Sequence, residues 1–327
     1  MQVEEVLVEL GGTASRAELL ARVTERALRR AVAGGSVQRR TRGHYALPVT
    51  PRIGQRAELR ELAEAGRRAA HELTGTAILL SATARWGWPT KWVAVKPQVA
   101  VPRGRRVPPG AGWRVDVRRR DVPPRDREDG WVTTRVRTAL DCACLLPPDE
   151  AVAVLDSALR EGAVDRDELL LAAGGLPRRY RGSAQRLISF ASPSAANPFE
   201  SVLRWIVSDI PGLQVRPQVR IADGDGVIGV VDLADEQLRI GIEADSFAWH
   251  GDRVSLERDC IRYNRLTAEG WLVLRFSWDQ VMHHPERVRD LVQRAVAQSY
   301  LRVRHTCGEC SRGWTPENQG SPESLPR

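Results

Sequence analysis

The chain of 327 residues is 42% apolar, enough for two or three domains with buried cores. Its net charge of +8 favours a polyanionic partner. No apolar run reaches the roughly 18 residues of a membrane span, and the acidic start MQVEEVLVEL lacks the pattern of a signal peptide. Five scattered cysteines fit a reduced protein. We therefore expect a cytoplasmic protein with no membrane partner.

Residues 1–50 are predicted to form three helices followed by a β-hairpin. Ser15 and Glu18 have the spacing of a capping box at the start of the second helix. The third helix, at about residues 24–33, would bury its alanine and leucine positions and turn its arginines outward. This order is typical of a winged helix-turn-helix, in which the third helix enters the major groove and the wing contacts phosphates.

We therefore predict that this module binds double-stranded DNA. The arginines expected to do so lie on the third helix and the hairpin: Arg26, Arg29, Arg30, Arg40 and Arg42. The alternative is a small helical protein-interaction module. The hairpin end Arg42-Gly43-His44-Tyr45-Ala46-Leu47 resembles the N-terminal antitoxin domain of abortive-infection type IV (AbiEi-like) systems. The resemblance implies a toxin-antitoxin context, and it leaves open whether the chain has a toxin partner or forms a homodimer.

The sequence of residues 51–178 predicts an α/β region, and we recognise no set of catalytic residues in it. The phrases Ser81-Ala82-Thr83-Ala84 and Arg137-Thr138-Ala139-Leu140-Asp141 resemble the linking domain of the same antitoxin-like proteins. We expect Asp141 and Asp156 on helix surfaces or at caps. Arginine-rich loops at residues 103–106 and 118–120 fit either a phosphate-binding surface or a solvated face, and the sequence does not decide between them.

Residues 179–197 are rich in Arg, Ser, Ala and Pro and predict a linker, after which a third domain covers residues 198–302. The polar residues 303–327 predict a disordered tail. Cys307 and Cys310 in this tail, with His305, resemble half of a zinc site that lacks a fourth ligand. The predicted fold class is a multidomain α/β (α+β) protein.

The third domain is predicted to run as one helix, three strands, a helix, a strand and a last helix. Asn197 and Glu200 have capping-box spacing around Pro198 at the first helix, and capping alone explains Glu200. The three strands are expected at residues 214–221, 227–233 and 238–244. Along the third, side-chain alternation turns Glu243 and Asp245 to one face.

Asp232 ends the neighbouring strand, so a tight antiparallel turn would bring it near Glu243. Three converging carboxylates repel one another unless a cation lies between them, and oxygen ligands suit Mg²⁺ or Mn²⁺. We therefore predict that Asp232, Glu243 and Asp245 bind the metal, with His250 as acid, base or phosphate donor. The alternative is that Asp245 starts a turn and His250 is a surface residue.

A helix at residues 255–269 follows, with Arg258, Arg262 and Arg265 on one face and Asp259 positioned to pair with Arg262. These arginines would contact DNA phosphates or form a solvated face with neighbouring acids. A buried strand at residues 271–276 and a helix at residues 285–300 complete the domain.

This element order resembles the restriction-endonuclease-like (PD-(D/E)xK) core, and more closely the branch related to very-short-patch mismatch-repair endonucleases. The stretches Ile242-Glu243-Ala244-Asp245-Ser246-Phe247-Ala248-Trp249-His250-Gly251 and Gly270-Trp271-Leu272-Val273-Leu274-Arg275-Phe276 carry the similarity. The resemblance implies Asp232 as the main metal ligand, Glu243 or Asp245 as the second, and Glu200 as an accessory acid. Asp245 stands where the usual motif has lysine.

The sequence thus predicts a metal-dependent DNA endonuclease with its own DNA-binding module, in phage defence or DNA repair. The alternative is an antitoxin-like transcriptional regulator whose nuclease fold is degenerate. RNA cleavage is a third, weaker hypothesis.

Overall fold

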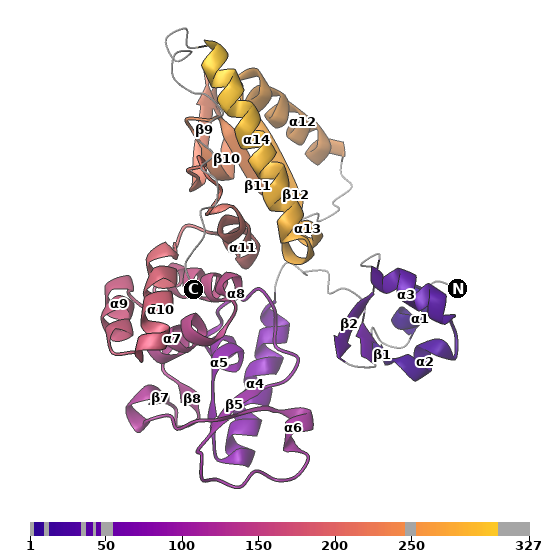
Figure 1. Cartoon of the computed structure of the whole chain (residues 1–327), viewed down its shortest axis with the longest axis vertical. Helices are drawn as coiled ribbons and strands as arrows, with labels where there is room; N and C mark the ends of the chain where they lie inside the picture. Colours follow the sequence, from indigo (N-terminus) through magenta and orange to yellow (C-terminus); the bar gives the residue numbers. More distant parts are fainter. Residues whose placement is uncertain are drawn as a thin grey trace, which may run out of the picture. The chain divides into compact units, whose positions relative to one another are not determined.

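The computed structural model describes residues 3–9, 13–33, 37–41, 44–46, 55–245 and 253–306. The chain divides into two compact units, Met1–Gly54 and Gln55–Arg327 (Figure 1). No helix in these described ranges is long and apolar enough to cross a membrane.

The small N-terminal unit contains three short helices and a three-stranded sheet. The Ser15 hydroxyl accepts the Glu18 N–H and the Glu18 carboxylate accepts the Ser15 N–H, so the predicted capping box starts the second helix. Buried Val6, Leu7 and Leu19 anchor its core. The sheet has the order β1-β3-β2 and is antiparallel. The elements are α1 (Val3–Glu9), β1 (Thr13–Ser15), α2 (Arg16–Leu20), α3 (Glu25–Ala33), β2 (Gln38–Thr41) and β3 (His44–Ala46).

The large unit begins with a mixed five-stranded sheet in the order β6-β5-β4-β8-β7. Helix α4 packs its buried leucines and alanines against this sheet and against α5. The elements are α4 (Arg56–Leu73), β4 (Thr76–Ala77), α5 (Leu79–Trp86), β5 (Gln98–Val101), α6 (Ala111–Arg114), β6 (Asp116–Arg119), β7 (Arg127–Glu128) and β8 (Val132–Thr133).

Four helices follow: α7 (Arg135–Leu145), α8 (Pro148–Arg160), α9 (Arg166–Gly174) and α10 (Arg178–Phe190). The prediction of a linker over residues 179–197 is wrong, because α10 occupies most of it. Ala184, Leu187 and Ile188 form a buried stripe on α10 at helical spacing, and that stripe packs on α7 and α9. The arginines that suggested a linker lie on the opposite, exposed side of the helix.

The C-terminal part has a four-stranded sheet in the order β12-β11-β10-β9. Strands β9, β10 and β11 form an antiparallel meander, and α12 returns the chain so that β12 pairs parallel to β11 (Figure 1). The elements are α11 (Pro198–Val207), β9 (Arg216–Asp223), β10 (Gly226–Asp235), β11 (Ile240–Asp245), α12 (Arg253–Ala268), β12 (Leu272–Ser277), α13 (Trp278–His283) and α14 (Pro285–Thr306).

Helices cover both faces of this sheet. Ile240 and Ile242 pack with α11 and α14 on one face, whereas Val231 packs with Leu266 of α12 on the other. The alternation predicted for β11 is therefore confirmed, with Ile240, Ile242 and Ala244 sharing one core. Helix α14 ends at Thr306, beyond the expected residue 300. The proposed tail zinc ligands Cys307 and Cys310 lie outside the described residues.

The middle and C-terminal regions share packing instead of meeting at a flexible boundary. Ala153 of α8 belongs to the apolar core built around α11 and the C-terminal sheet. In the other direction, Trp205 of α11 packs on the core of the middle helices and makes an edge contact with Phe190, 5.3 Å between ring centroids. Helix α8 thus supports the first helix of the C-terminal region directly.

Candidate active site

Two carboxylates, Glu200 on α11 and Asp232 on β10, share one amide donor. The Nε2 of Gln218 on β9 donates to Glu200 Oε2 (2.8 Å) and to Asp232 Oδ1 (3.4 Å). Gln218 has a φ of 54°, a conformation that is costly for a side chain larger than glycine. Gln218 is not evident as a site residue in the sequence, because its only local signal is a polar residue inside a strand.

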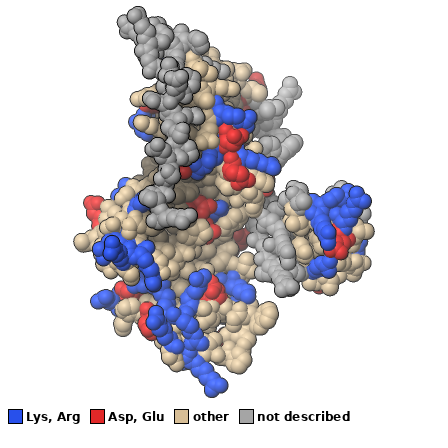
Figure 2. All heavy atoms as spheres, in the orientation of Figure 1, with Lys and Arg blue, Asp and Glu red and all other residues tan. Residues whose placement is uncertain are grey.

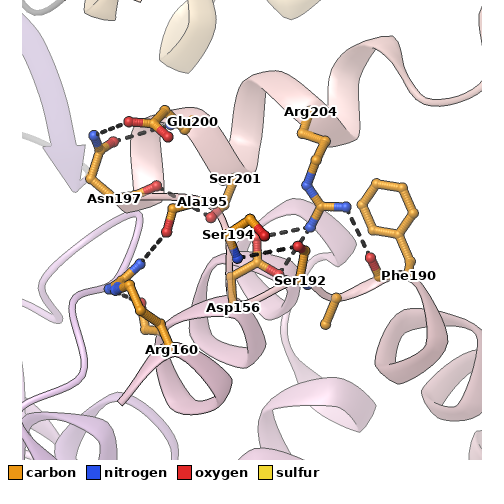
Figure 3. A network of polar contacts seen from close by, with 12 residues as sticks. Asp156, Arg160, Phe190, Ser192, Ser194, Ala195, Asn197, Glu200, Ser201 and Arg204 are labelled. Atoms are coloured by element: carbon orange, nitrogen blue, oxygen red, sulfur yellow. Dashed lines mark hydrogen bonds and ion pairs between the residues drawn. The ribbon is translucent and has the colours of Figure 1, made fainter. Parts of the chain in front are cut away.

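Glu200 does cap α11, but not in the predicted way. Asn197 Oδ1 accepts the N–H groups of Phe199 (2.9 Å) and Glu200 (3.1 Å), as expected of an N-cap. The Glu200 carboxylate, however, accepts the N–H of Ala196 (2.8 Å) and the side-chain amide of Asn197 (2.7 Å), as Figure 3 shows for Asn197. Capping therefore does not account for its third donor, Gln218.

Both carboxylates are harder to ionise than usual. Burial raises the pKa of Glu200 to about 6 against the opposing effect of the Ala196 N–H, and the charge of Asp232 adds to the rise. Burial also raises the pKa of Asp232, with Glu243 adding to the rise, while the Ala244 N–H, which donates to Asp232 at 2.8 Å, opposes it. The site therefore holds negative charge that its protein neighbours only partly balance.

Glu243 lies beside Asp232, as the hairpin register predicts. Leu233 pairs with Ile242 across the antiparallel ladder, which brings the next pair, Asp232 and Glu243, together. The turn that sets this register is fixed by the Asp235 carboxylate, which accepts the backbone N–H groups of Gln237 and Leu238 in the turn and of Gln214 before β9. The expected approach of Asp232 and Glu243 follows from this tight turn.

The Glu243 carboxylate is 7% exposed and fully engaged by α12. Arg262 donates to both carboxylate oxygens, and its Nη1 lies 3.1 Å from Oε2. The Tyr263 hydroxyl also donates to Oε2. A Cβ on Gly229 would lie 2.7 Å from Arg262 Nε, so this position admits Arg262 only because it is glycine. The predicted pairing of Arg262 with Asp259 is wrong, since the buried carboxylate is the stronger partner.

Asp245 pairs with Arg275 of the adjacent parallel strand, 2.7 Å between Oδ2 and Nη2. Among the described residues, no three acidic, histidine or cysteine side chains are placed to hold a metal ion. His250 belongs to residues 246–252, outside the described part of the chain. The structure thus places Asp232 beside Glu200, with which it shares the Gln218 amide, and beside its cross-strand neighbour Glu243, and it ties Asp245 to Arg275.

The predicted DNA-contacting arginines of α12 differ in their surroundings. Arg265 donates to Asp223 (2.7 Å from Nε), and Arg262 to Glu243, so both are used inside the domain. Arg258 is exposed. Two arginines of this set therefore have a structural explanation, whereas Arg258 has no polar partner among the described residues.

On the N-terminal unit, Arg26, Arg29 and Arg30 are exposed, as predicted, and line a shallow pocket with Glu25. Arg29 pairs with Glu25 at 2.9 Å. Arg42 and the side chain of Arg40 lie outside the described residues.

A buried ion pair fixes the base of this site. Arg204 Nη2 of α11 donates to both oxygens of Asp156 on α8 (3.0 and 2.8 Å), and Arg204 Nη1 donates to the Phe190 carbonyl (2.9 Å). Asp156 also accepts the Ser192 N–H (2.7 Å), and Arg160 donates to the Ala195 carbonyl (2.6 Å) (Figure 3). The segment that ends in the Glu200 cap is therefore held by α8.

The expectation that Asp141 and Asp156 lie on helix surfaces is wrong. Asp156 is fully buried, and Asp141 is 4% exposed and accepts from Arg120 and Arg137, each at 2.9 Å. A carboxylate buried this deeply needs a partner of opposite charge, and both acids have an arginine partner.

A restriction-endonuclease-like family model, REase_MTES_1575, matches residues 199–296. This match covers α11 through most of α14 and supports a nuclease-like C-terminal domain.

Two curated relatives are Uncharacterized protein MT2308 and Uncharacterized protein Rv2248, from two strains of Mycobacterium tuberculosis. Each is 31% identical over 162 residues, which cover 48% of this chain and 58% of the relative. The chain thus matches little more than half the length of either relative. The crystal structure of the RV2827C protein from Mycobacterium tuberculosis is 16% identical, with a TM-score of 0.28, covering 62% of this chain and 78% of that one.

Proposed function

We propose that the C-terminal domain is a divalent-metal-dependent DNA endonuclease, with Glu200 and Asp232 at its metal site. One observation carries the proposal: a buried carboxylate, Glu200, and a half-buried one, Asp232, share a single amide donor, and both have a raised pKa. A cation between them would stabilise their charged forms. Their oxygen atoms are the ligands that Mg²⁺ and Mn²⁺ prefer.

When bound, the cation would orient a phosphodiester and lower the pKa of an attacking water. Asp232 and Glu200 would hold it, and the Gln218 amide would orient both carboxylates. Glu243 would become a further metal ligand only if the cation displaced Arg262 from its carboxylate. Asp245 would become a ligand only if its ion pair with Arg275 broke. We retain His250 as the proposed acid, base or phosphate donor, because it follows β11 by five residues.

The N-terminal unit would bring this domain to duplex DNA. Its three helices and three-stranded sheet fit a winged helix-turn-helix, and exposed Arg26, Arg29 and Arg30 lie on the helix that would enter the major groove. This role supports double-stranded DNA as the partner and rests on charge and element order.

A second candidate function is an antitoxin-like DNA-binding regulator without catalysis. Arg262 and Tyr263 fill the oxygens of Glu243, and Arg275 pairs with Asp245. Those partners stabilise the acids without a metal, which is what a domain that has lost catalysis would need.

Cleavage of supercoiled and linear DNA in Mg²⁺, Mn²⁺ or EDTA separates the two functions. The nuclease proposal predicts cleavage in metal, none in EDTA, and at least about a 100-fold slower rate for Asp232→Ala. Asp209→Ala, an exposed acid on the same domain, is the control. Cleavage that survives Asp232→Ala would refute the site, and DNA binding without cleavage would favour the regulator.

A further inference from the structure

Nearly all of the chain's excess positive charge lies in one short stretch of the middle region. Residues 96–120 contain eight basic residues and a single acid, Asp116, in a chain whose net charge is +8. The basic residues are Lys96, Arg103, Arg105, Arg106, Arg114, Arg118, Arg119 and Arg120. Figure 2 shows Lys and Arg side chains gathered over the lower end of the large unit.

The fold gathers this stretch at one edge of the five-stranded sheet. Strand β6 is the edge strand, and it pairs parallel to β5 so that Val101 lies opposite Arg119. The loop between them starts at Pro102, and Arg119 donates to the carbonyl of Arg105 within that loop. The two arginine clusters, separate in sequence, therefore share one surface. We call residues 96–120 the basic edge.

The basic edge is ordered by contacts of most of its arginines, including the Arg118–Asp116 and Arg120–Asp141 ion pairs, and two guanidinium groups are left unused. Arg105 donates to Thr74 (2.7 Å) at the end of α4, and Arg114 pairs with Glu72 (3.1 Å) on the same helix. Arg103 and Arg106 are exposed and have no polar partner in the described part of the chain. Unpaired arginines on a scaffolded loop suit phosphate groups.

The same stretch of sequence contains an exposed aromatic ring. Trp113 of α6 is 84% exposed, although tryptophan gains much from burial. Lys96 Nζ donates to the carbonyl of the preceding residue, Gly112 (3.3 Å), so a cation lies next to the base of this side chain. An aromatic ring amid basic groups is the combination by which proteins hold unpaired bases.

We propose that the basic edge binds a single-stranded segment of DNA, with its arginines on the phosphates and Trp113 stacked on an unpaired base. In a duplex the bases stay stacked on one another. Duplex DNA would therefore contact the arginines but would have no unpaired base to stack on Trp113. The proposal rests on the proposed nuclease function only for the choice of DNA over RNA. It gives the chain a site for the strand that is opened or displaced next to a cut.

The test is binding of a labelled single-stranded DNA oligonucleotide to the full chain in EDTA, followed by fluorescence anisotropy. Trp113→Ala should weaken binding about tenfold, and Trp113→Phe should restore most of it, because every aromatic ring offers a stacking face. Leu171→Ala removes an equally exposed apolar side chain on α9, 82% exposed, and should bind as the unchanged protein does.

The arginines are tested by the salt dependence of the same binding. A chain with Arg103→Gln and Arg106→Gln should lower the slope of log affinity against log salt by about 1.4, or 0.7 for each lost phosphate contact. A matched chain with Arg178→Gln and Arg179→Gln, exposed on α10, should keep the slope.

Unchanged affinity of Trp113→Ala for the single strand would overturn the proposal. So would an equal loss for single-stranded and duplex DNA, since that would make the basic edge a general polyanion surface. Tighter binding to RNA than to DNA of the same sequence would overturn the choice of DNA. Binding is measured without metal, so failure of cleavage in a separate assay would leave these results intact.

Discussion

The middle and C-terminal regions of the large unit use charge in opposite ways. Residues 55–197 carry 24 Arg and Lys against 17 Asp and Glu, whereas residues 198–306 carry 14 Arg against 16 Asp and Glu. The nuclease-like domain is therefore slightly acidic, and the region before it is strongly basic. If this domain cleaves DNA, as we propose, other parts of the chain would have to supply the positive charge that holds the DNA.

The two regions also differ in how their arginines are engaged. In the C-terminal domain Arg262, Arg265 and Arg275 are paired with acids. On the basic edge Arg114, Arg118 and Arg120 also pair with acids, whereas Arg103 and Arg106 are exposed and have no such partner among the described residues. The position of an arginine in the sequence therefore says little about its role until its acidic neighbours are known.

The largest expected effect comes from the buried pair that joins the regions. Asp156→Ala leaves Arg204 charged and unpaired in the core, so it should lower the free energy of unfolding by about 3–5 kcal/mol. Asp209→Ala breaks the exposed Asp209–Arg289 pair and should cost about 1 kcal/mol or less. Urea unfolding followed by circular dichroism measures both. Equal losses would show that α8 does not support α11 through this contact.

The second effect is the pH dependence that Glu200 confers. Its pKa is raised to about 6 from 4.5 by burial, so the folded state binds this proton more tightly than the unfolded state. Its contribution to stability is therefore full below about pH 4.5 and declines by about 2 kcal/mol as pH rises through 6. Asp232, also raised, acts in the same direction.

Urea unfolding between pH 4.5 and 7.5 measures this decline, which Glu200→Gln should reduce. Glu61→Gln, an exposed carboxylate on α4, serves as the control. Mg²⁺ should stabilise the protein at pH 7.5 more than at pH 4.5, because the cation needs the ionised carboxylates. A Mg²⁺ effect independent of pH would place the cation elsewhere.

A third prediction concerns the Arg262–Glu243 pair. If Arg262 competes with the cation for Glu243, Arg262→Gln should raise the affinity for Mn²⁺ about tenfold, which corresponds to about 1.4 kcal/mol. Arg265 lies on the same helix and is paired with Asp223 of β9, so Arg265→Gln should leave the Mn²⁺ affinity unchanged. Titration calorimetry measures both variants. No gain for Arg262→Gln would exclude Glu243 as a latent ligand.

The smallest effect is expected at the N-terminal unit. Arg29→Ala with Arg30→Ala should weaken duplex binding and lower the salt slope by up to about 2, or roughly 0.9 for each lost phosphate contact. Arg56→Ala with Arg60→Ala, exposed on α4, is the matched control. Anisotropy with a labelled duplex at several salt concentrations measures the slope. An unchanged slope would remove α3 as the duplex anchor.

Local signals predicted much of the fold from the sequence. The three strands predicted at residues 214–221, 227–233 and 238–244 are present as β9, β10 and β11. The Ser15–Glu18 capping box and the Asn197 cap of α11 are local contacts of three residues or fewer, so the sequence contains both partners. The alternation in β11 likewise follows from strand geometry alone.

Contacts between distant segments could not be predicted. Asp156 finds Arg204 48 residues away, and Glu243 finds Arg262 19 residues away. The sequence around either acid does not indicate its arginine partner. For that reason the sequence predicts Asp156 on a helix surface and Glu243 as a metal ligand. The α10 helix was missed for a different reason: its short apolar stripe of Ala184, Leu187 and Ile188 is outweighed by arginines.

Calorimetric titration of the full chain with Mn²⁺ at pH 7.5 measures whether Glu200 and Asp232 hold a cation. We expect one site per chain that disappears in Asp232→Ala and weakens in Glu200→Gln, while Asp209→Ala keeps it. Absence of binding to the unchanged protein, or equal binding by Asp232→Ala, would contradict the proposed metal site.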